Sequence, residues 1–162
     1  MLRDKSLVPL SRQHQHALAL CVRIKRALQG PKADLVGWQE EIERIFEDEI
    51  RDHFEAEERI LFPKAAEVPE LKSLVAELLA EHGTLRDFFG KAAAGQLQAS
   101  ELGQFARTLS QHIRKEEGQL FELSQRIFSA VQLGEIGTEF ASVLEESITH
   151  ARKCALPKHN LR

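Results

Sequence analysis

Two ten-residue stretches of this chain, HFEAEERILF at residues 53–62 and HIRKEEGQLF at residues 112–121, share the pattern H-x-x-x-E-E-x-x-L-F. On an α-helix, positions i and i+4 lie one above the other on the same face, so each stretch directs an imidazole and a carboxylate at one point. A single pair of this kind arises by chance in many helices. Two extended copies predict two long helices that each supply a histidine and a glutamate to a common site.

The residues around these stretches predict an all-α chain. Helix-forming residues dominate, apolar residues recur at helical spacing, and glycine and proline cluster at a few places that mark helix ends. The four expected helices run from after Pro9, with Ser11 as cap, to Gly30–Pro31; from a cap at Asp34 to an end marked by Pro63 and Pro69; from Leu71 to the small residues 92–95; and from near Ser100 to a pattern that fades near Leu133–Gly134.

Four long helices with short connections imply antiparallel neighbours, and therefore an up-down-up-down four-helix bundle. A further amphipathic pattern follows, which predicts an additional C-terminal helix. We expect residues 1–133 to form the bundle and residues 134–162 to form the C-terminal helix and tail, packed on the same domain. The apolar positions of this last segment are Ile136, Phe140, Val143, Leu144 and Ile148.

The first and third helices each carry one histidine on the apolar stripe, His14 and His82. His16 competes with His14, but the face on which it lies is less apolar, which favours His14. At about 1.5 Å per residue from the intervening turns, His53 and His82 lie at a similar height, and His82 and His112 lie within about one helical turn of each other. Four histidines and two glutamates are therefore expected at one level of the bundle.

Burial of these six polar groups in an apolar bundle is unfavourable unless their charges and lone pairs find partners, and metal cations supply such partners. Two ions bridged by Glu57 and Glu116, with two histidines on each, would use about eight of twelve octahedral positions. A bridging oxo or hydroxo group would fill two more. About one position per ion would then be open to a small ligand such as dioxygen. Imidazole and carboxylate suit iron, although manganese or zinc would also be accepted.

Several of these motifs resemble a known family. Residues 10–14 (LSRQH), the paired HxxxE stretches, the Leu61-Phe62-Pro63 run after the first of them, and Glu81-His82 are similar to hemerythrin-like HHE cation-binding domains over roughly residues 10–121. The resemblance implies a four-helix bundle with a non-haem di-iron centre. The metal ligands that it implies are His14, His53, Glu57, His82, His112 and Glu116.

The chain departs from the oxygen-carrying hemerythrins at two places. Those proteins have a second histidine one turn after the third-helix ligand, where this chain has Arg86, and an aspartate five residues after the last histidine, whereas Glu116 follows His112 at four. The chain is more similar to the symmetric branch with four histidines and two carboxylates. The resemblance to that branch implies iron or oxygen sensing, responses to nitric oxide and peroxide, or repair of damaged iron centres.

Glu58 and Glu117 follow the two proposed carboxylate ligands directly. We expect them to support the ligands or to lie at the surface, although either can exchange roles with its neighbour.

Composition excludes several other classes. A net charge of -3 and a pI near 6.2 give no basic surface for nucleic acid. No apolar stretch is long enough for a signal peptide or a membrane helix, and Cys21 and Cys154 form no CxxC pair, so a reducing cytoplasm is expected.

Three hypotheses remain: a sensor or store that binds dioxygen, nitric oxide, peroxide or iron; an enzyme that acts on nitric oxide or peroxide or repairs iron centres; and a structural bundle with zinc or no metal. The C-terminal helix would offer a surface to a protein partner or a homodimer.

Overall fold

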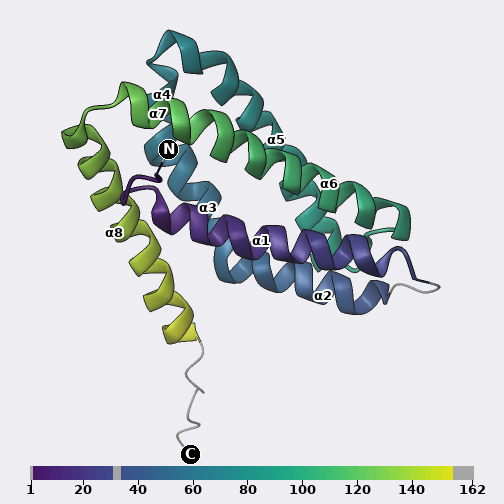
Figure 1. Ribbon diagram of the computed structural model, residues 1–162. Coiled ribbons are helices and arrows are strands. Elements are labelled where there is room, and N and C mark those ends of the chain that lie inside the picture. The colour runs from purple at the N-terminus through teal and green to yellow at the C-terminus, as the bar shows by residue number, and fades with distance from the viewer. Residues whose placement is uncertain (1, 31–33, 155–162) are drawn as a thin grey trace, which may run out of the picture.

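The computed structural model describes residues 2–30 and 34–154, with side chains up to residue 144. The described residues form five continuous helices and contain no strand, which confirms the predicted all-α bundle. The helices are α1 (Val8–Ala27); a second run of α2 (Leu35–Ile45), η1 (Phe46–Ile50), α3 (Arg51–Ala56), η2 (Glu57–Leu61) and α4 (Phe62–Ala66); α5 (Pro69–Ala93); a fourth run of α6 (Ala99–Lys115), η3 (Glu116–Leu120) and α7 (Phe121–Ile127); and α8 (Ala130–Cys154) (Figure 1).

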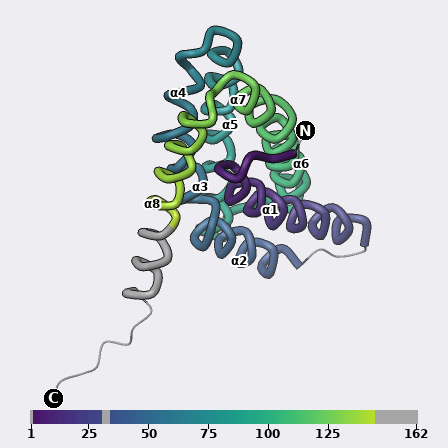
Figure 2. Tube along the Cα trace, turned by 60° about the vertical axis from the view of Figure 1, so that its left-hand side comes forward, coloured from purple at the N-terminus to yellow at the C-terminus, as the bar shows by residue number. Residues whose placement is uncertain are grey.

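Helices in the bundle alternate in direction along the chain (Figure 1). α1 packs along α6, α2 along α5, and α5 also contacts α4 and α6, while α8 crosses the second helix at α3 and η2 (Figures 1 and 2). Among the described helices, none has a span both long and apolar enough to cross a lipid bilayer.

Pro9 was expected to precede the first helix and Pro63 to mark the end of the second, but both lie inside helices. Pro9 is in the first turn of α1, which begins at Val8, so the predicted start after Pro9 with a Ser11 cap is wrong. Pro63 is in the first turn of α4, and the helix continues to Ala66 before Pro69 opens α5. Pro9 fits its position because its missing N–H is not needed in a first helical turn, whereas Pro63 lies inside the continuous second helix, directly after the π turn η2.

Side-chain caps account for two other helix starts. The Asp34 side chain accepts a hydrogen bond from the Gly37 backbone N–H at 3.1 Å, as predicted for the second helix. The fourth helix begins at Ala99, near Ser100 as predicted, and the Glu101 carboxylate accepts from the Gln98 N–H at 2.9 Å.

The fourth helix ends earlier than expected. α7 ends at Ile127 and Phe128 adopts an extended conformation, so the predicted fading near Leu133–Gly134 is wrong. The physical reason is a reciprocal cap: Ser129 N–H donates to Gln132 Oε1 at 2.9 Å, and Gln132 N–H donates to Ser129 Oγ at 3.3 Å. This capping box opens α8 at Ala130.

The apolar interior consists of two clusters separated by a polar layer. One cluster includes Leu10, Leu61 and Leu120 together with Ile136 and Phe140 of α8. The other fills the opposite end of the bundle, between α1, α2, α5 and α6. Each of the four bundle helices passes from one cluster to the other at a histidine. The second cluster includes Leu20, Ile42, Ile50, Phe89, Phe105 and Leu109.

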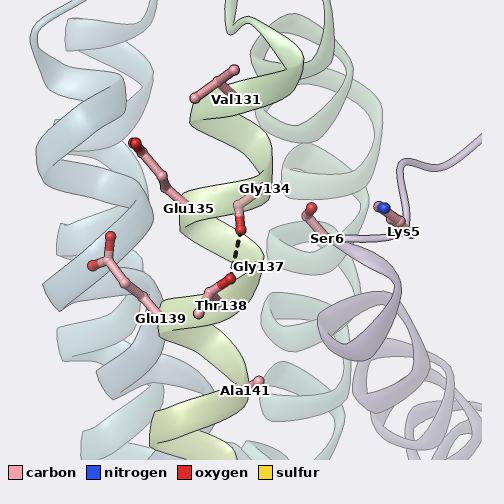
Figure 3. A pocket seen from close by; sticks show the side chains of 9 residues that line it. All are labelled: Lys5, Ser6, Val131, Gly134, Glu135, Gly137, Thr138, Glu139 and Ala141. Carbon is pink, nitrogen blue, oxygen red and sulfur yellow. Dashed lines mark hydrogen bonds between the residues drawn. The ribbon is translucent and has the colours of Figure 1, made fainter.

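The N-terminal segment lies against α8 along an open groove of about 950 Å³ (Figure 3). Lys5 and Ser6 line one side of the groove, and residues of α8 from Val131 to Ala141 line the other. The close approach depends on Gly137, because a Cβ atom at this position would lie 2.8 Å from the Cβ of Ser6.

Phe140→Ala tests whether α8 is part of the bundle core. Phe140 is 0% exposed, so we expect its truncation to lower the free energy of unfolding by about 3–5 kcal/mol. Val131→Ala, at a side chain that is 71% exposed on the same helix, is the control and should change it by less than about 0.5 kcal/mol. Urea unfolding followed by circular dichroism measures both. Equal midpoints for the two variants would show that α8 does not contribute to the core.

Candidate metal centre

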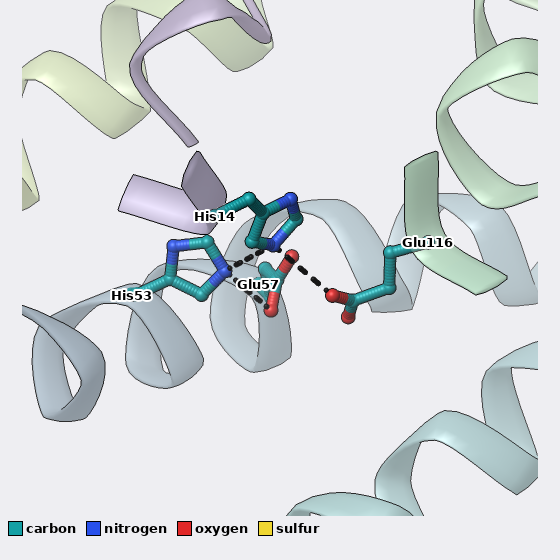
Figure 4. A group of neighbouring side chains, drawn as sticks. All are labelled: His14, His53, Glu57 and Glu116. Carbon is teal, nitrogen blue, oxygen red and sulfur yellow. Dashed lines mark hydrogen bonds and ion pairs between the residues drawn. The ribbon is translucent and has the colours of Figure 1, made fainter. Parts of the chain in front are cut away.

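The structure brings all six of the predicted site residues together in the polar layer. Two groups of four residues each place their donor atoms within 4.8 Å of one another, and Glu57 and Glu116 belong to both groups. Figure 4 shows the first group, with the His14 ring between His53 and the Glu116 carboxylate. The first group adds His14 and His53 to the shared carboxylates, and the second adds His82 and His112. All six residues are at most 2% exposed.

Each glutamate of the layer begins a π-helical turn. In η2 the Phe62 N–H bonds to the Glu57 carbonyl, and in η3 the Phe121 N–H bonds to the Glu116 carbonyl, five residues back in both cases. Isolated π turns of this kind are rare and recur at functional sites. The two copies of the sequence pattern therefore have the same backbone distortion at the same position. The sequence analysis predicted regular α-helices here and did not predict the π turns.

The imidazoles face one another in pairs. The Nε2 atoms of His14 and His53 lie 2.9 Å apart, and those of His82 and His112 lie 3.1 Å apart. Each Nδ1–H donates outward to an oxygen, so in a neutral ring each Nε2 carries a lone pair directed at the other ring. Two such lone pairs repel unless a cation lies between them.

These nitrogen–nitrogen distances also fit one coordination geometry better than another. With metal–nitrogen bonds of about 2.1 Å, neighbouring ligands lie roughly 3.0 Å apart at octahedral angles and roughly 3.4 Å apart at tetrahedral angles. The observed 2.9 Å and 3.1 Å match the octahedral spacing. The four imidazoles and two carboxylates present would therefore be able to hold metal cations.

The two shared carboxylates need positive charge. All four oxygens of Glu57 and Glu116 are buried, and three of them have imidazole Nε2 atoms at 3.1–3.7 Å as polar neighbours. Burial acts to raise the pKa of both carboxyl groups, but the surrounding histidines outweigh it and hold the pKa of Glu57 below its usual range and that of Glu116 well below. Two ionised carboxylates thus lie side by side in an apolar interior.

The negative charge of the carboxylates raises the pKa of three of the site histidines. Burial acts to lower the pKa of His14, but the Glu116 and Glu117 carboxylates raise it to about 9. The pKa of His82 also rises to about 9 and that of His112 to about 10, because Glu57 and Glu116 overcome the effect of burial on both. When no metal is bound, protons on these imidazoles supply the positive charge that the carboxylates attract.

Hydrogen bonds from a surrounding shell orient the four rings. Their Nδ1 atoms lie 2.7–2.9 Å from acceptor oxygens of residues adjacent in sequence to site residues on other helices. Such partners fix which nitrogen faces the centre and raise its basicity. The pairs are His14 with Glu117, His53 with Gln13, His82 with Glu58, and His112 with Glu81.

Of these acceptors, the sequence singled out only Glu58 and Glu117, which lie beside the cluster and support its histidines. Gln13 and Glu81 were missed in this role, although each stands directly before a site histidine. Each of the three outer carboxylates also pairs with a cation. Glu117 pairs with Arg3 at 2.5 Å, Glu58 pairs with Arg86 at 2.7 Å, and Glu81 pairs with Lys115. The outer shell is thus balanced, whereas the inner carboxylates have only histidines around them.

Three other features define the surroundings. His16 is 63% exposed and pairs with Glu49 at 2.9 Å, away from the layer that contains His14. Arg86, the residue at the position of the additional hemerythrin histidine, lies over the Phe54 ring and bonds to Glu58. Phenylalanine rings form apolar walls: Phe54 stacks on His82 at 3.7 Å between centroids, and Phe121 stacks on His14 at 5.5 Å.

A helical bundle with a buried layer of histidines, and with two glutamates that belong to both ligand groups, indicates a metal-binding protein. Residues 7–124 match the family described as the hemerythrin HHE cation binding domain, and the chain belongs to this family. Comparisons with curated proteins and with solved structures gave no significant match.

Metal binding should become tighter as pH rises. The raised pKa values of His14, His82 and His112 mean that their protonation stabilises the metal-free fold fully below about pH 6.5, and this contribution is lost as pH rises toward 9 to 10. A metal needs neutral imidazoles and therefore displaces these protons. We expect the increase in Tm caused by a fixed excess of Mn²⁺ to grow between pH 6.5 and 8.5, as measured by anaerobic scanning calorimetry.

Proton release on Mn²⁺ addition, measured in weakly buffered solution at pH 7, is the companion experiment. A Tm increase that does not change with pH, together with no released protons, would contradict this electrostatic description of the site.

Proposed function

We propose that this chain holds two iron ions and uses them to bind or sense a small ligand such as dioxygen, nitric oxide or peroxide. In this proposal His14 and His53 bind one ion, His82 and His112 bind the other, and Glu57 and Glu116 bridge them. The observation that carries the proposal is the pair of buried, ionised carboxylates that belong to both ligand groups. A cation on each side is what such carboxylates require.

The donor set favours iron over zinc. Structural zinc sites are closed and tetrahedral, whereas the histidine nitrogens here have octahedral spacing, and none of the grouped ligands is a cysteine. Imidazole with carboxylate and an open position is typical of non-haem iron. Manganese shares these preferences and is the nearest competitor.

The enclosure of the layer favours a ligand of two or a few atoms. The six residues are at most 2% exposed, and Phe54, Phe62 and Phe121 contact the imidazoles. When bound, the iron pair supplies open coordination positions and electrons. The chain orients the imidazoles through the outer acceptors and excludes bulk water with its phenylalanine rings.

We also propose that α8 passes the state of the centre to a protein partner or a second copy of the chain. A continuous set of contacts supports this relay. His14 bonds to Glu117, Glu117 bonds to Arg3 of the N-terminal segment, and Ser6 of that segment lies against Gly137 of α8. A change at the centre would reach α8 through this segment.

Removal of shared and unshared ligands tests the assignment. Wild-type protein loaded anaerobically should hold about two irons per chain, and Glu57→Gln should lose most of both because both ligand groups contain this carboxylate. His112→Ala should weaken mainly one ion. The matched control is His16→Ala, at an exposed histidine outside both groups, which should keep both irons. Iron analysis with the ultraviolet-visible spectrum provides the measurement, and iron retention by Glu57→Gln would contradict the proposed bridge.

Exposure of the reduced protein to dioxygen, nitric oxide or peroxide separates a sensor or store from an enzyme. A sensor forms a stable or slowly decaying adduct, with at most about one ligand consumed per centre. An enzyme consumes nitric oxide or peroxide in large excess over protein when an electron donor is supplied. We expect the first behaviour, and sustained turnover would assign the chain to the enzyme class.

A further inference from the structure

The four acceptors that hold the site histidines are not all of one kind. Three of them are carboxylates, each paired with an arginine or a lysine. The fourth is the amide oxygen of Gln13, which lies 2.9 Å from Nδ1 of His53. The shell around His53 is therefore uncharged at the point where the other three histidines face a negative oxygen.

Gln13 and Glu81 are equivalent positions in the two halves of the bundle. Gln13 directly precedes His14 and binds the histidine of the second helix, whereas Glu81 directly precedes His82 and binds His112 of the fourth helix. The other pair of acceptors, Glu58 and Glu117, is the same in both halves. Among these four acceptors, the amide in place of a carboxylate is thus the one chemical difference between the halves.

This difference changes how strongly each imidazole donates to a metal. A carboxylate that accepts from Nδ1–H draws the proton toward itself and makes Nε2 a stronger donor, whereas a neutral amide does so less. Lys115 offsets the charge of Glu81 only in part, because its ammonium group also pairs with Glu77 at 2.6 Å. His112 is therefore the stronger ligand, and His53 the weaker.

We propose that Gln13 makes the two metal positions unequal, so that the ion at His14 and His53 is held more weakly than the ion at His82 and His112. This inference rests on the proposed two-ion centre. Gln13 acts as a positioning residue, because it contacts a ligand and not a metal. The weaker position is the one that exchanges its ion with solution while the other ion stays bound, so one half of the centre is suited to the release and uptake of a divalent metal.

Anaerobic calorimetric titration with Fe²⁺, and in parallel with Mn²⁺, tests the inequality. The wild-type chain should bind two ions in steps whose affinities differ by about 10–100-fold, the usual effect of an outer-shell partner. Gln13→Glu should strengthen the weaker step until the two nearly coincide, and Glu81→Gln should instead weaken the stronger step. Gln15→Glu adds the same charge at an exposed position of α1 and should leave both steps unchanged.

Mössbauer spectra of protein loaded with ferrous iron-57 give a second readout that a purely structural role of Gln13 would not alter. The wild type should show two iron environments, with one equivalent of iron filling mainly one of them, and Gln13→Glu should bring the two together. Gln13→Ala guards against misfolding of the charged variant and should widen the gap between the two binding steps.

Two equal binding steps in the wild type, or a separation that Gln13→Glu leaves unchanged, would overturn the inequality while leaving the two-ion site intact. Two unequal steps with Mn²⁺ but no binding of Fe²⁺ would support the role of Gln13 and refute the assignment to iron. Absence of binding with both metals would refute both proposals.

Discussion

The carboxylates of Glu57 and Glu116 are buried and ionised beside the imidazoles of the site, and the surrounding structure is arranged around their negative charge. Two such groups in an apolar bundle would be strongly destabilising without cations. The four imidazoles bring their Nε2 atoms to the same layer, where either protons or metal ions can neutralise it. The apolar clusters on either side of the polar layer exclude water, so the carboxylates depend more strongly on these cations for neutralisation.

The residues around the six site residues hold the site histidines in place. Glu58, Glu81 and Glu117 orient histidines, and each pairs with an arginine or a lysine, which reduces the negative charge around the site. The arginine paired with Glu117 comes from the N-terminal segment, which also packs against α8. The centre is therefore connected to two segments outside the four bundle helices, the N-terminal segment and α8.

Much of the site could be predicted from helix geometry alone. His53 with Glu57 and His112 with Glu116 are i, i+4 pairs, so a helix fixes their relation, and the apolar stripe distinguished His14 from His16. The π turns at both glutamates could not be predicted, because nothing in helix propensity marks them. The contact of Arg3 with Glu117 depends on how the N-terminal segment folds back, which is a tertiary event.

Other features have a signal in the sequence that the prediction did not use. Ser129-x-x-Gln132 is a capping-box pattern that places the start of α8, and the periodicity of apolar residues across this point concealed it. Gln13 and Glu81 stand directly before the lone histidines, yet their reach to the histidine of the next helix depends on how neighbouring helices pack. Patterns within one helix were thus easier to predict than contacts between helices.

The central claim is that two cations occupy the layer between His14, His53, His82 and His112, joined by Glu57 and Glu116. Anomalous diffraction from crystals of iron-loaded protein, recorded on both sides of the iron absorption edge, tests it most directly. Our account predicts two separate iron peaks, each contacted by two of the four histidines and both contacted by the two glutamates. A single peak, or iron located anywhere outside this layer, would contradict it.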